Sequence, residues 1–344
     1  MKLGIIGLPQ SGKTTVFEAL TRSVTAEGSQ REGRIGTITV PDPRVDILSG
    51  MYTPRKTIFA QVAYFLPGKG DPSGATQKGP SIWIQVRDCD ALIHAVRNFS
   101  GYGFDPPTPR ADIAAIDQEL IISDLMVVEK RLERLALDAR RGKKPNQEEM
   151  ALLDRCKAYL DNETPLRRFD DIAAAKLLRG YAFLSAKPLL ILFNNDEEND
   201  RPPDAASLPP GEASIVIRAK LERELAQISE EEAREFLAEF NITASATDRV
   251  IQRSYDLLGL ISFFTVGEDE VRAWTIGRGT DAVEAAEVIH SDIKKGFIRA
   301  EVLAYKDLVA AGTYAEARKK GVVRLEGKTY TVCDGDIINF RFNV

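Results

Sequence analysis

Apolar residues along this chain occur in short runs that alternate with stretches of helical periodicity. The runs predict strands at residues 3–6, 36–40, 57–66, 91–96, 189–193 and 214–217. Residues 41–44 are typical of a turn, and the polar segments 25–34 and 67–80 are typical of loops. Short buried strands separated by helices indicate a wound α/β sheet. We therefore expect an α/β domain.

A long helix is expected between the strands at 91–96 and 189–193. Within residues 111–141, apolar residues are spaced alternately by four and three, as in a heptad seam: Ile121, Leu125, Val128, Leu132 and Leu135. A polar break at 141–146 precedes a second helix at 147–160, which places Leu153, Cys156 and Leu160 on one face. We predict an inserted antiparallel helical hairpin. The alternative is two ordinary helices packed on the sheet.

The chain becomes rich in strands from residue 261. Strands are expected at 261–266, 271–276, 297–304, 322–325, 329–333 and 337–342, with helices at 281–289 and 314–320. Two further helices, 229–240 and 245–258, precede this region. Because few crossover helices are present, we expect a separate α+β domain at 261–344. A discontinuous P-loop nucleotide-binding domain is expected at 1–105 and 166–260, with the helical insertion at 106–165.

Residues 7–14 contain a candidate phosphate-binding motif. They are Gly-Leu-Pro-Gln-Ser-Gly-Lys-Thr, between the first strand and a helix. This is the P-loop pattern G-x-x-x-x-G-K-[ST], in which backbone N–H groups and the positive end of the following helix bind phosphate oxygens. Lys13 is expected to reach the β- and γ-phosphates, and the Thr14 hydroxyl to coordinate Mg²⁺. A chance glycine-rich turn is the alternative, but the order of strand, loop and helix favours a nucleotide-binding protein.

Composition narrows the class of protein. A length of 344 residues favours two or three domains, and 44% hydrophobic residues with 28% charged residues are typical of a soluble globular protein. No apolar run is long enough to cross a bilayer, and a cleaved secretory signal would remove the first strand. We therefore expect a cytoplasmic protein without membrane contact. The net charge of −5 excludes a generally basic nucleic-acid coat, although not local basic patches.

Cysteine and histidine are too sparse for several kinds of site. Cys89, Cys156 and Cys333 are widely spaced and odd in number, so we expect reduced thiols in the core rather than a disulfide framework. His94 and His290 lie far apart without Cys or carboxylate neighbours at metal spacing. This argues against a zinc site and against a Ser-His catalytic triad.

The C-terminal region contains the most specific resemblance to a known family. The stretches that resemble it are residues 264–267, 271–276, 288–292, 295–301, 334–336 and 340–344. Together with residues 40–44, 90–94 and 218–220, they are similar to the YchF or Obg-like ATPases, a branch of the translation-factor-related P-loop NTPases, over nearly the whole chain. The resemblance implies that the C-terminal region is a TGS domain, a ubiquitin-like β-grasp module associated with RNA or ribosome contact.

The resemblance also implies how the base is bound. Residues 194–197, Asn-Asn-Asp-Glu, resemble the family's Asn-x-x-Glu variant of the guanine-binding Asn-Lys-x-Asp motif. It implies that adenine is tolerated and that ATP binds at least as well as GTP; from the residues alone, the run is equally typical of a polar turn. Ala219 and Lys220 match the fifth nucleotide-contacting motif. With ATP or GTP as ligand and Thr14 as a ligand of Mg²⁺, the expected binding residues are Gly7, Gln10, Ser11, Gly12, Lys13, Thr14, Thr15, Gly68, Asn194, Asn195, Glu197, Ala219 and Lys220.

The family's metal-binding motif, Asp-x-x-Gly, is degenerate in this chain. The corresponding residues 64–68 are Tyr-Phe-Leu-Pro-Gly, so Gly68 can keep a γ-phosphate contact but no carboxylate is present, and Asp71 lies on the wrong side of the turn. Gln30 falls near the position expected for the switch-I threonine, and Thr25 and Thr37 are poor substitutes. Because phosphoryl transfer depends on charge neutralisation, we expect binding to survive better than hydrolysis. No catalytic residue can be named from the sequence.

Three functions remain open at this point. The first is a slow, ATP-preferring NTPase that regulates contact with the translation machinery, and the second is a nucleotide-binding adaptor with little or no hydrolysis. The third, a small-molecule kinase, requires an Arg-bearing lid that the helical hairpin is poorly placed to supply. Contact with the ribosome or RNA is expected at the hairpin tip, Arg140, Arg141, Lys143 and Lys144, and on the C-terminal domain at Lys294, Lys295 and Arg299. The alternative is that these cations are only solvated or meet helix dipoles.

Overall fold

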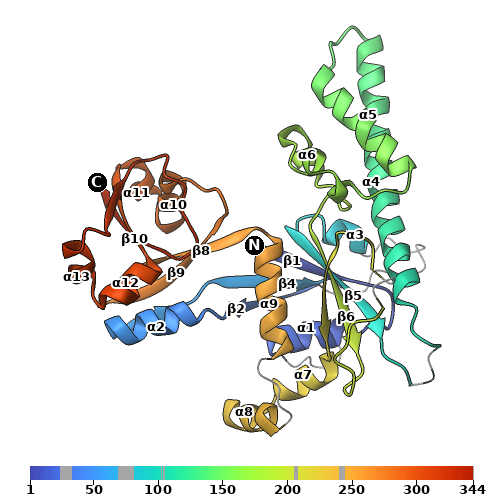
Figure 1. Ribbon diagram of the computed structural model, residues 1–344. Coiled ribbons are helices and arrows are strands. Elements are labelled where there is room, and N and C mark those ends of the chain that lie inside the picture. Colours follow the sequence, from blue (N-terminus) through green and yellow to red (C-terminus); the bar gives the residue numbers. More distant parts are fainter. Residues whose placement is uncertain are drawn as a thin grey trace. The chain divides into compact units, whose positions relative to one another are not determined.

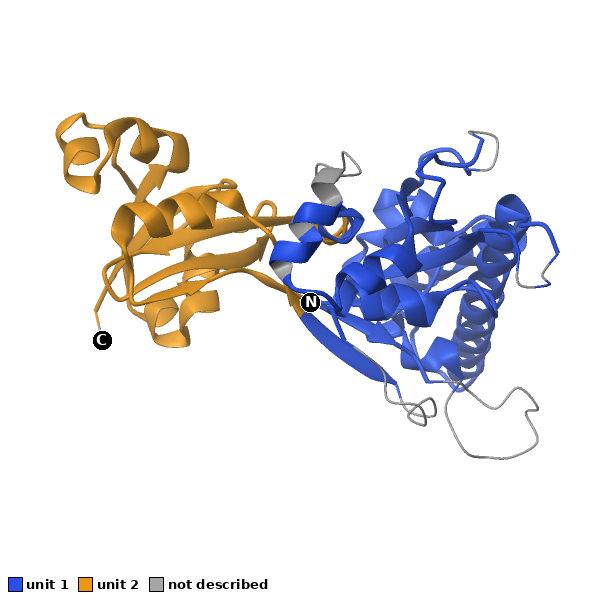
Figure 2. Ribbon diagram, turned by 90° about the horizontal axis from the view of Figure 1, so that it is seen from below, with its two compact units in different colours: residues 1–37, 63–250 blue, residues 38–62, 251–344 orange. Residues whose placement is uncertain are grey.

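The computed structural model describes residues 1–23, 33–68, 81–101, 103, 105–204, 208–239 and 245–343. The chain forms two compact units, which Figure 2 distinguishes by colour. The first unit comprises residues 1–37 and 63–250, and the second comprises residues 38–62 and 251–344. In the described parts of the chain, no helix combines the length and apolar character needed to span a bilayer.

A six-stranded sheet forms the centre of the first unit, with the strand order β2-β4-β1-β5-β6-β7. Strand β1 pairs in parallel with β4 and β5, and β5, β6 and β7 continue the parallel pairing. This arrangement confirms the predicted wound α/β sheet. The strands are β1 (Lys2–Ile6), β2 (Arg34–Thr39), β4 (Gln61–Leu66), β5 (Ala91–Asn98), β6 (Leu189–Asn195) and β7 (Ala213–Ile217).

Helices of very different length lie between and after these strands (Figure 1). Helix α1 follows β1, and α4 and α5 lie between β5 and β6. The helices are α1 (Lys13–Thr21), α3 (Ile82–Gln85), α4 (Pro109–Arg140), α5 (Gln147–Asp161), η1 (Leu166–Arg168), α6 (Asp170–Ala173), η2 (Lys176–Tyr181), α7 (Ala219–Leu225), α8 (Glu230–Glu239) and α9 (Ala246–Leu257), of which α9 crosses the boundary between the units.

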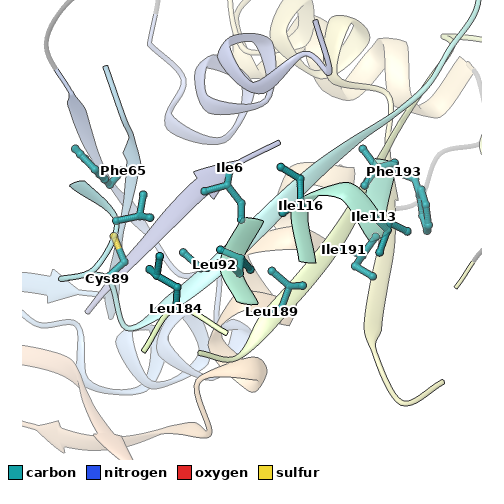
Figure 3. Close-up of a cluster of buried hydrophobic side chains, with 13 residues drawn as sticks. Ile6, Phe65, Cys89, Leu92, Ile113, Ile116, Leu184, Leu189, Ile191 and Phe193 are labelled. Atoms are coloured by element: carbon teal, nitrogen blue, oxygen red, sulfur yellow. The ribbon is translucent and has the colours of Figure 1, made fainter. Parts of the chain in front are cut away.

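One hydrophobic cluster of the first unit lies between the sheet and the start of α4. Figure 3 shows Leu92 of β5 and Ile191 of β6 among the side chains that meet Ile113 and Ile116 of α4. Strands β5 and β6 are apolar for most of their length because they are central strands, covered on both faces. Their carboxyl ends, which carry polar residues, are thereby held on a rigid scaffold.

Helices α4 and α5 form the predicted hairpin (Figure 1). Ile121, Val128 and Leu135 of α4 are buried in one cluster with the expected face of α5. That face consists of Leu153, Cys156 and Leu160. The heptad seam is therefore confirmed as a packing interface, which extends to residues 166–183.

A buried carboxylate fixes α4 to the chain segment before β6. Asp124 of α4 has no exposed surface, and it accepts hydrogen bonds from the backbone N–H groups of Leu184 at 2.9 Å and Ser185 at 2.6 Å. Arg87 also points at this carboxylate, at 3.5 Å, and donates to Ser123 and to the carbonyl of Ala182. The charge of Asp124 is thus compensated by three donors, as burial of a carboxylate requires.

The second unit is built on another six-stranded sheet, with the order β11-β10-β12-β8-β9-β3. Its core contains Phe263, Phe297 and Phe340, with the rings of Phe263 and Phe340 edge to face at 6.1 Å. The strands are β3 (Lys56–Ile58), β8 (Leu260–Val266), β9 (Glu270–Gly277), β10 (Phe297–Ala304), β11 (Arg324–Glu326) and β12 (Asp336–Phe342). The helices are α2 (Pro43–Tyr52), α10 (Ala282–Ile289), α11 (Ser291–Lys295), α12 (Tyr305–Ala311) and α13 (Tyr314–Lys319).

Residues 38–62 differ most from the sequence-based expectation. The single strand expected at 57–66 is two strands: β3 pairs in parallel with β9 of the second unit, whereas β4 pairs with β1 of the first. The turn expected at 41–44 is the start of α2, where Asp42 is the N-cap and Pro43 the first helical residue. Residues 38–62 thus belong to the same compact unit as the C-terminal sheet, whereas the nucleotide-binding domain expected at residues 1–105 and 166–260 remains a prediction.

Two smaller expectations were wrong. The strand expected at 329–333 is a single bridge, between Thr331 and Asp281. Cys333 is exposed, and only the other two cysteines are buried. Burial raises the pKa of Cys89 and of Cys156 to about 11, so both remain protonated thiols in the core.

Candidate functional site

The loop between β1 and α1 has the backbone geometry that a P-loop requires. Gly7 and Gly12 have φ angles of 151° and 86°, which side-chain-bearing residues rarely adopt. A Cβ atom at Gly7 would overlap the carbonyl oxygen of Ala95, and one at Gly12 would overlap the amide of Asn194. Both glycines are therefore required by sterics as well as by the motif.

Lys13 lies over this loop. Its Nζ donates to the carbonyl oxygens of Gly7 at 2.9 Å and Leu8 at 2.6 Å. Lys13 is also the first residue of α1, where the helix dipole adds positive potential. Gln10 and Thr14 are exposed and Thr15 is half-buried, so the two threonines begin the helix at or near the surface.

Ser11 is a buried polar residue within the loop. Its Oγ is buried and has no hydrogen-bond partner among the described residues. An unpaired buried hydroxyl is unfavourable unless a ligand or water completes it. Together with the glycine cradle and the Lys13 ammonium, this donor set fits a phosphate group.

Asn194 joins the loop to β6 and α7. This buried residue lies at the carboxyl end of β6, and its Nδ2 donates to the carbonyl of Ser11 at 3.2 Å. Its Oδ1 accepts from the backbone N–H of Ala219 at 3.2 Å, at the start of α7. The side chain thus links the loop, β6 and α7, and positions the site.

Asn195, which is expected to contact the nucleotide, is hydrogen-bonded within the protein. Its Oδ1 accepts from Asn98 at 2.8 Å, and its Nδ2 donates to the carbonyls of Asn199 at 3.0 Å and Arg201 at 2.7 Å. The amide is therefore engaged in shaping the loop after β6. Asn98 was not identified from the sequence, although its place at the carboxyl end of β5 is where ligand-binding groups collect in parallel sheets.

Glu197 and Lys220 form an ion pair at the same edge of the sheet. Lys220 Nζ lies 2.6 Å from Glu197 Oε1, and the two side chains are 50% and 43% exposed. Arg218 donates to the carbonyl oxygen of Glu197 at 3.3 Å and holds the same loop. The structure therefore brings together two of the residues expected at the base.

The position of the missing metal-binding carboxylate is filled by core side chains. Tyr64, Phe65 and Leu66 are buried, and Phe65 belongs to the hydrophobic cluster of the first unit (Figure 3). An aspartate at position 65 would place a charge in this cluster, so a single substitution cannot simply restore the motif. The described residues contain no group of three or more His, Cys, Asp or Glu side chains placed to hold a metal.

Gly68 is present but its N–H is occupied. It donates to Gln85 Oε1 at 3.0 Å, and the sequence gives no local sign of this contact because Gln85 lies on α3, 17 residues later. Thr25 and Gln30, near the expected switch-I position, and Asp71, the acid beyond Gly68, lie outside the described residues. Thr37 is an exposed residue of β2.

His94 is buried in β5, next to Ile6 in the register. Burial, reinforced by Arg167 and Lys13, lowers its pKa to about 3. His94 is therefore neutral at physiological pH and adds no charge behind the P-loop.

Known proteins resemble this chain over its whole length. Residues 260–343 match a family model named YchF-GTPase_C and described as a protein of unknown function (DUF933). The chain is 38% identical to the ribosome-binding ATPase YchF of Bacillus subtilis and 35% identical to that of Pasteurella multocida, with at least 99% of each chain covered. The structure of the Schizosaccharomyces pombe YchF GTPase matches with a TM-score of 0.83 at 31% identity, covering 99% of this chain and 97% of that one.

Proposed function

Because the chain belongs to the YchF family, we propose that it binds ATP and GTP at the loop between β1 and α1, hydrolyses them slowly, and acts in the cytoplasm as a nucleotide-dependent regulator near the ribosome. The observation that supports this most is the loop itself: two sterically required glycines, Lys13 above them, and Asn194 tying the loop to β6 and α7. The names of the relatives, ribosome-binding ATPase and GTPase, agree with it.

Each part of the loop has a distinct task in this proposal. The backbone N–H groups and the start of α1 bind the phosphates, and Lys13 exchanges its two carbonyl partners for β- and γ-phosphate oxygens. Thr14 would hold Mg²⁺ through its hydroxyl group. When bound, the metal would neutralise part of the phosphate charge. Glu197, Lys220 and Ala219 lie at the base end.

Slow hydrolysis follows from residues at the end of β4 and directly after it. Phe65 stands where the family motif has a carboxylate, and the Gly68 N–H is bonded to Gln85. The same two observations support the second candidate, a nucleotide-binding adaptor with little or no hydrolysis. Turnover measured with and without ribosomes distinguishes the two functions.

Titration calorimetry with ATP and with GTP, each with and without Mg²⁺, tests the proposed function. We expect both nucleotides to bind, and ATP to bind at least as tightly as GTP, because Glu197 stands where an aspartate would select guanine. A preference for GTP of a hundredfold or more, about 2.7 kcal/mol, would contradict the base assignment. If neither nucleotide bound, the proposed function itself would be wrong.

The hairpin tip is the better supported of the two basic surfaces. Arg140, Arg141, Lys143 and Lys144 are all exposed, although Lys143 also pairs with Asp138 at 3.1 Å. On the second unit, which we assign to the TGS class, Lys294 is paired with Glu284 and Glu287 and Lys295 with Asp292. The third candidate, Arg299, is an exposed residue of β10.

We predict that charge reversal at the tip weakens ribosome binding. The double variant Arg141→Glu with Lys144→Glu should reduce co-sedimentation with ribosomes at moderate salt, because contacts with phosphates are electrostatic and salt-sensitive. Nucleotide affinity should be unchanged. Arg249→Glu with Arg253→Glu is the matched control, since it reverses two exposed arginines on α9. Equal losses in both double variants, or a loss that does not depend on salt, would exclude the tip as the contact.

A further inference from the structure

The pairing of Glu197 with Lys220 bears on which bases the site accepts. We propose that Lys220 is a specificity-determining residue: together with Glu197 it presents one hydrogen-bond donor and one acceptor to the base edge, so that adenine is bound as well as guanine. This inference rests on the proposed nucleotide-binding function and deepens it.

The fold places the two residues at equivalent positions. Strands β6 and β7 are parallel neighbours, and Asn194 is the register partner of Ile217. Glu197 and Lys220 each lie three residues beyond these partners, so both follow the carboxyl ends of their strands. Ligands bind at this edge in open α/β sheets.

The pair is also fixed relative to the phosphate loop. Asn194 binds both the carbonyl of Ser11 and the N–H of Ala219, the residue before Lys220. A nucleotide whose phosphates lie on the loop therefore has a defined place for its base. Arg218 additionally holds the Glu197 backbone, at 3.3 Å.

The chemistry of the two side chains is complementary. An ionised carboxylate only accepts hydrogen bonds and an ammonium only donates them. Guanine offers two adjacent N–H donors, at N1 and N2, which suit a carboxylate alone. Adenine offers one donor, its N6 amino group, beside one acceptor, N1, and this pattern matches Glu197 and Lys220 together.

Lys220 should consequently act in opposite directions on the two bases. It donates to adenine N1, which has no other donor in this pair. For guanine it competes with the N1 and N2 protons for the Glu197 carboxylate, at 2.6 Å from Oε1. Removing the ammonium should thus weaken ATP binding and strengthen GTP binding. Because both side chains are half-exposed, the change in preference is modest, about tenfold in the ratio of dissociation constants.

The test is the ratio of the ATP and GTP dissociation constants, measured by calorimetry in the wild type, Lys220→Met and Lys220→Arg. We expect Lys220→Met to shift this ratio about tenfold towards GTP. Lys220→Arg, which keeps a donor, should stay within a few-fold of the wild type. The gain in affinity that Lys220→Met causes should be smaller for inosine triphosphate than for GTP, because inosine triphosphate lacks the N2 amino group of guanine.

The ratio of the two dissociation constants is insensitive to a general loss of stability. If Lys220 had only a structural role, its replacement would weaken the binding of ATP and GTP equally and leave this ratio unchanged. That outcome, with either nucleotide still bound, would overturn the inference and leave the proposed function intact. A wild-type protein that binds neither nucleotide would instead overturn the proposed function, and this inference with it.

Discussion

Replacement of Lys13 by alanine is expected to weaken ATP and GTP binding by several hundred-fold. Lys13 provides the one side-chain charge of the phosphate-binding loop, residues 7–14. Charge-assisted hydrogen bonds contribute about 1.5–3 kcal/mol each, so the loss of two such bonds to phosphates corresponds to about 3–4 kcal/mol or more. The effect on folding should be small, because the two carbonyls that Lys13 now contacts can bind water at the mouth of the loop.

Calorimetry with both nucleotides measures this loss, and thermal unfolding without nucleotide shows that the variant is folded. Arg22→Ala is the control, because Arg22 is an exposed cation that ends the same helix. It should leave affinity unchanged. An unaltered affinity in Lys13→Ala would show that the loop between β1 and α1 is not the phosphate site.

Replacement of Asp124 by alanine is expected to destabilise the first unit by about 3 kcal/mol or more. The variant leaves the buried N–H groups of Leu184 and Ser185 without an acceptor and Arg87 without its counter-charge. Removing one partner of a buried charge network typically costs about 3–5 kcal/mol. Asp124→Asn keeps one acceptor oxygen and should show an intermediate loss.

Urea unfolding followed by Trp83 fluorescence measures this effect, with Trp274→Phe as the background so that the signal comes from the first unit alone. Glu133→Ala is the matched control, since Glu133 is an exposed carboxylate on the same helix. Equal midpoints for Asp124→Ala and Glu133→Ala would show that the buried carboxylate does not stabilise the hairpin junction.

Local patterns were sufficient for much of the fold. The apolar runs predicted most of the strands, and the heptad spacing predicted the α4–α5 hairpin, because burial of one face imposes a period on the sequence. The start of α2 was misassigned as a turn, although Asp42 followed by Pro43 is a typical helix start. Alternation also could not show that β3 and β4 belong to different sheets, since strand periodicity contains no information about the partner strand.

The candidate site, like the fold, was predicted from the sequence only where local residues specify it. The P-loop was predicted because its geometry is specified within eight consecutive residues. The contact between Asn194 and Ser11 joins residues 183 positions apart, and Gly68 meets Gln85 across 17 positions. Such contacts depend on which strands are neighbours, so the sequence could not show that polar groups of Asn194, Asn195 and Gly68 are bonded within the protein. Their assignment to the nucleotide remains a prediction.

The position of β3 limits how the C-terminal sheet can be isolated. A fragment of residues 260–343, the part that the family model matches, would contain β8 to β12 but lack β3, which pairs with β9. Strand β9 would then become an exposed edge, and unprotected edges promote association between copies. Excision at residue 260 would also remove Arg44, which pairs with Asp334 at 2.7 Å and lies over the ring of Phe264. A soluble version of this sheet therefore needs residues 38–62 rejoined to it through a designed linker, or a charged substitution along the outer edge of β9.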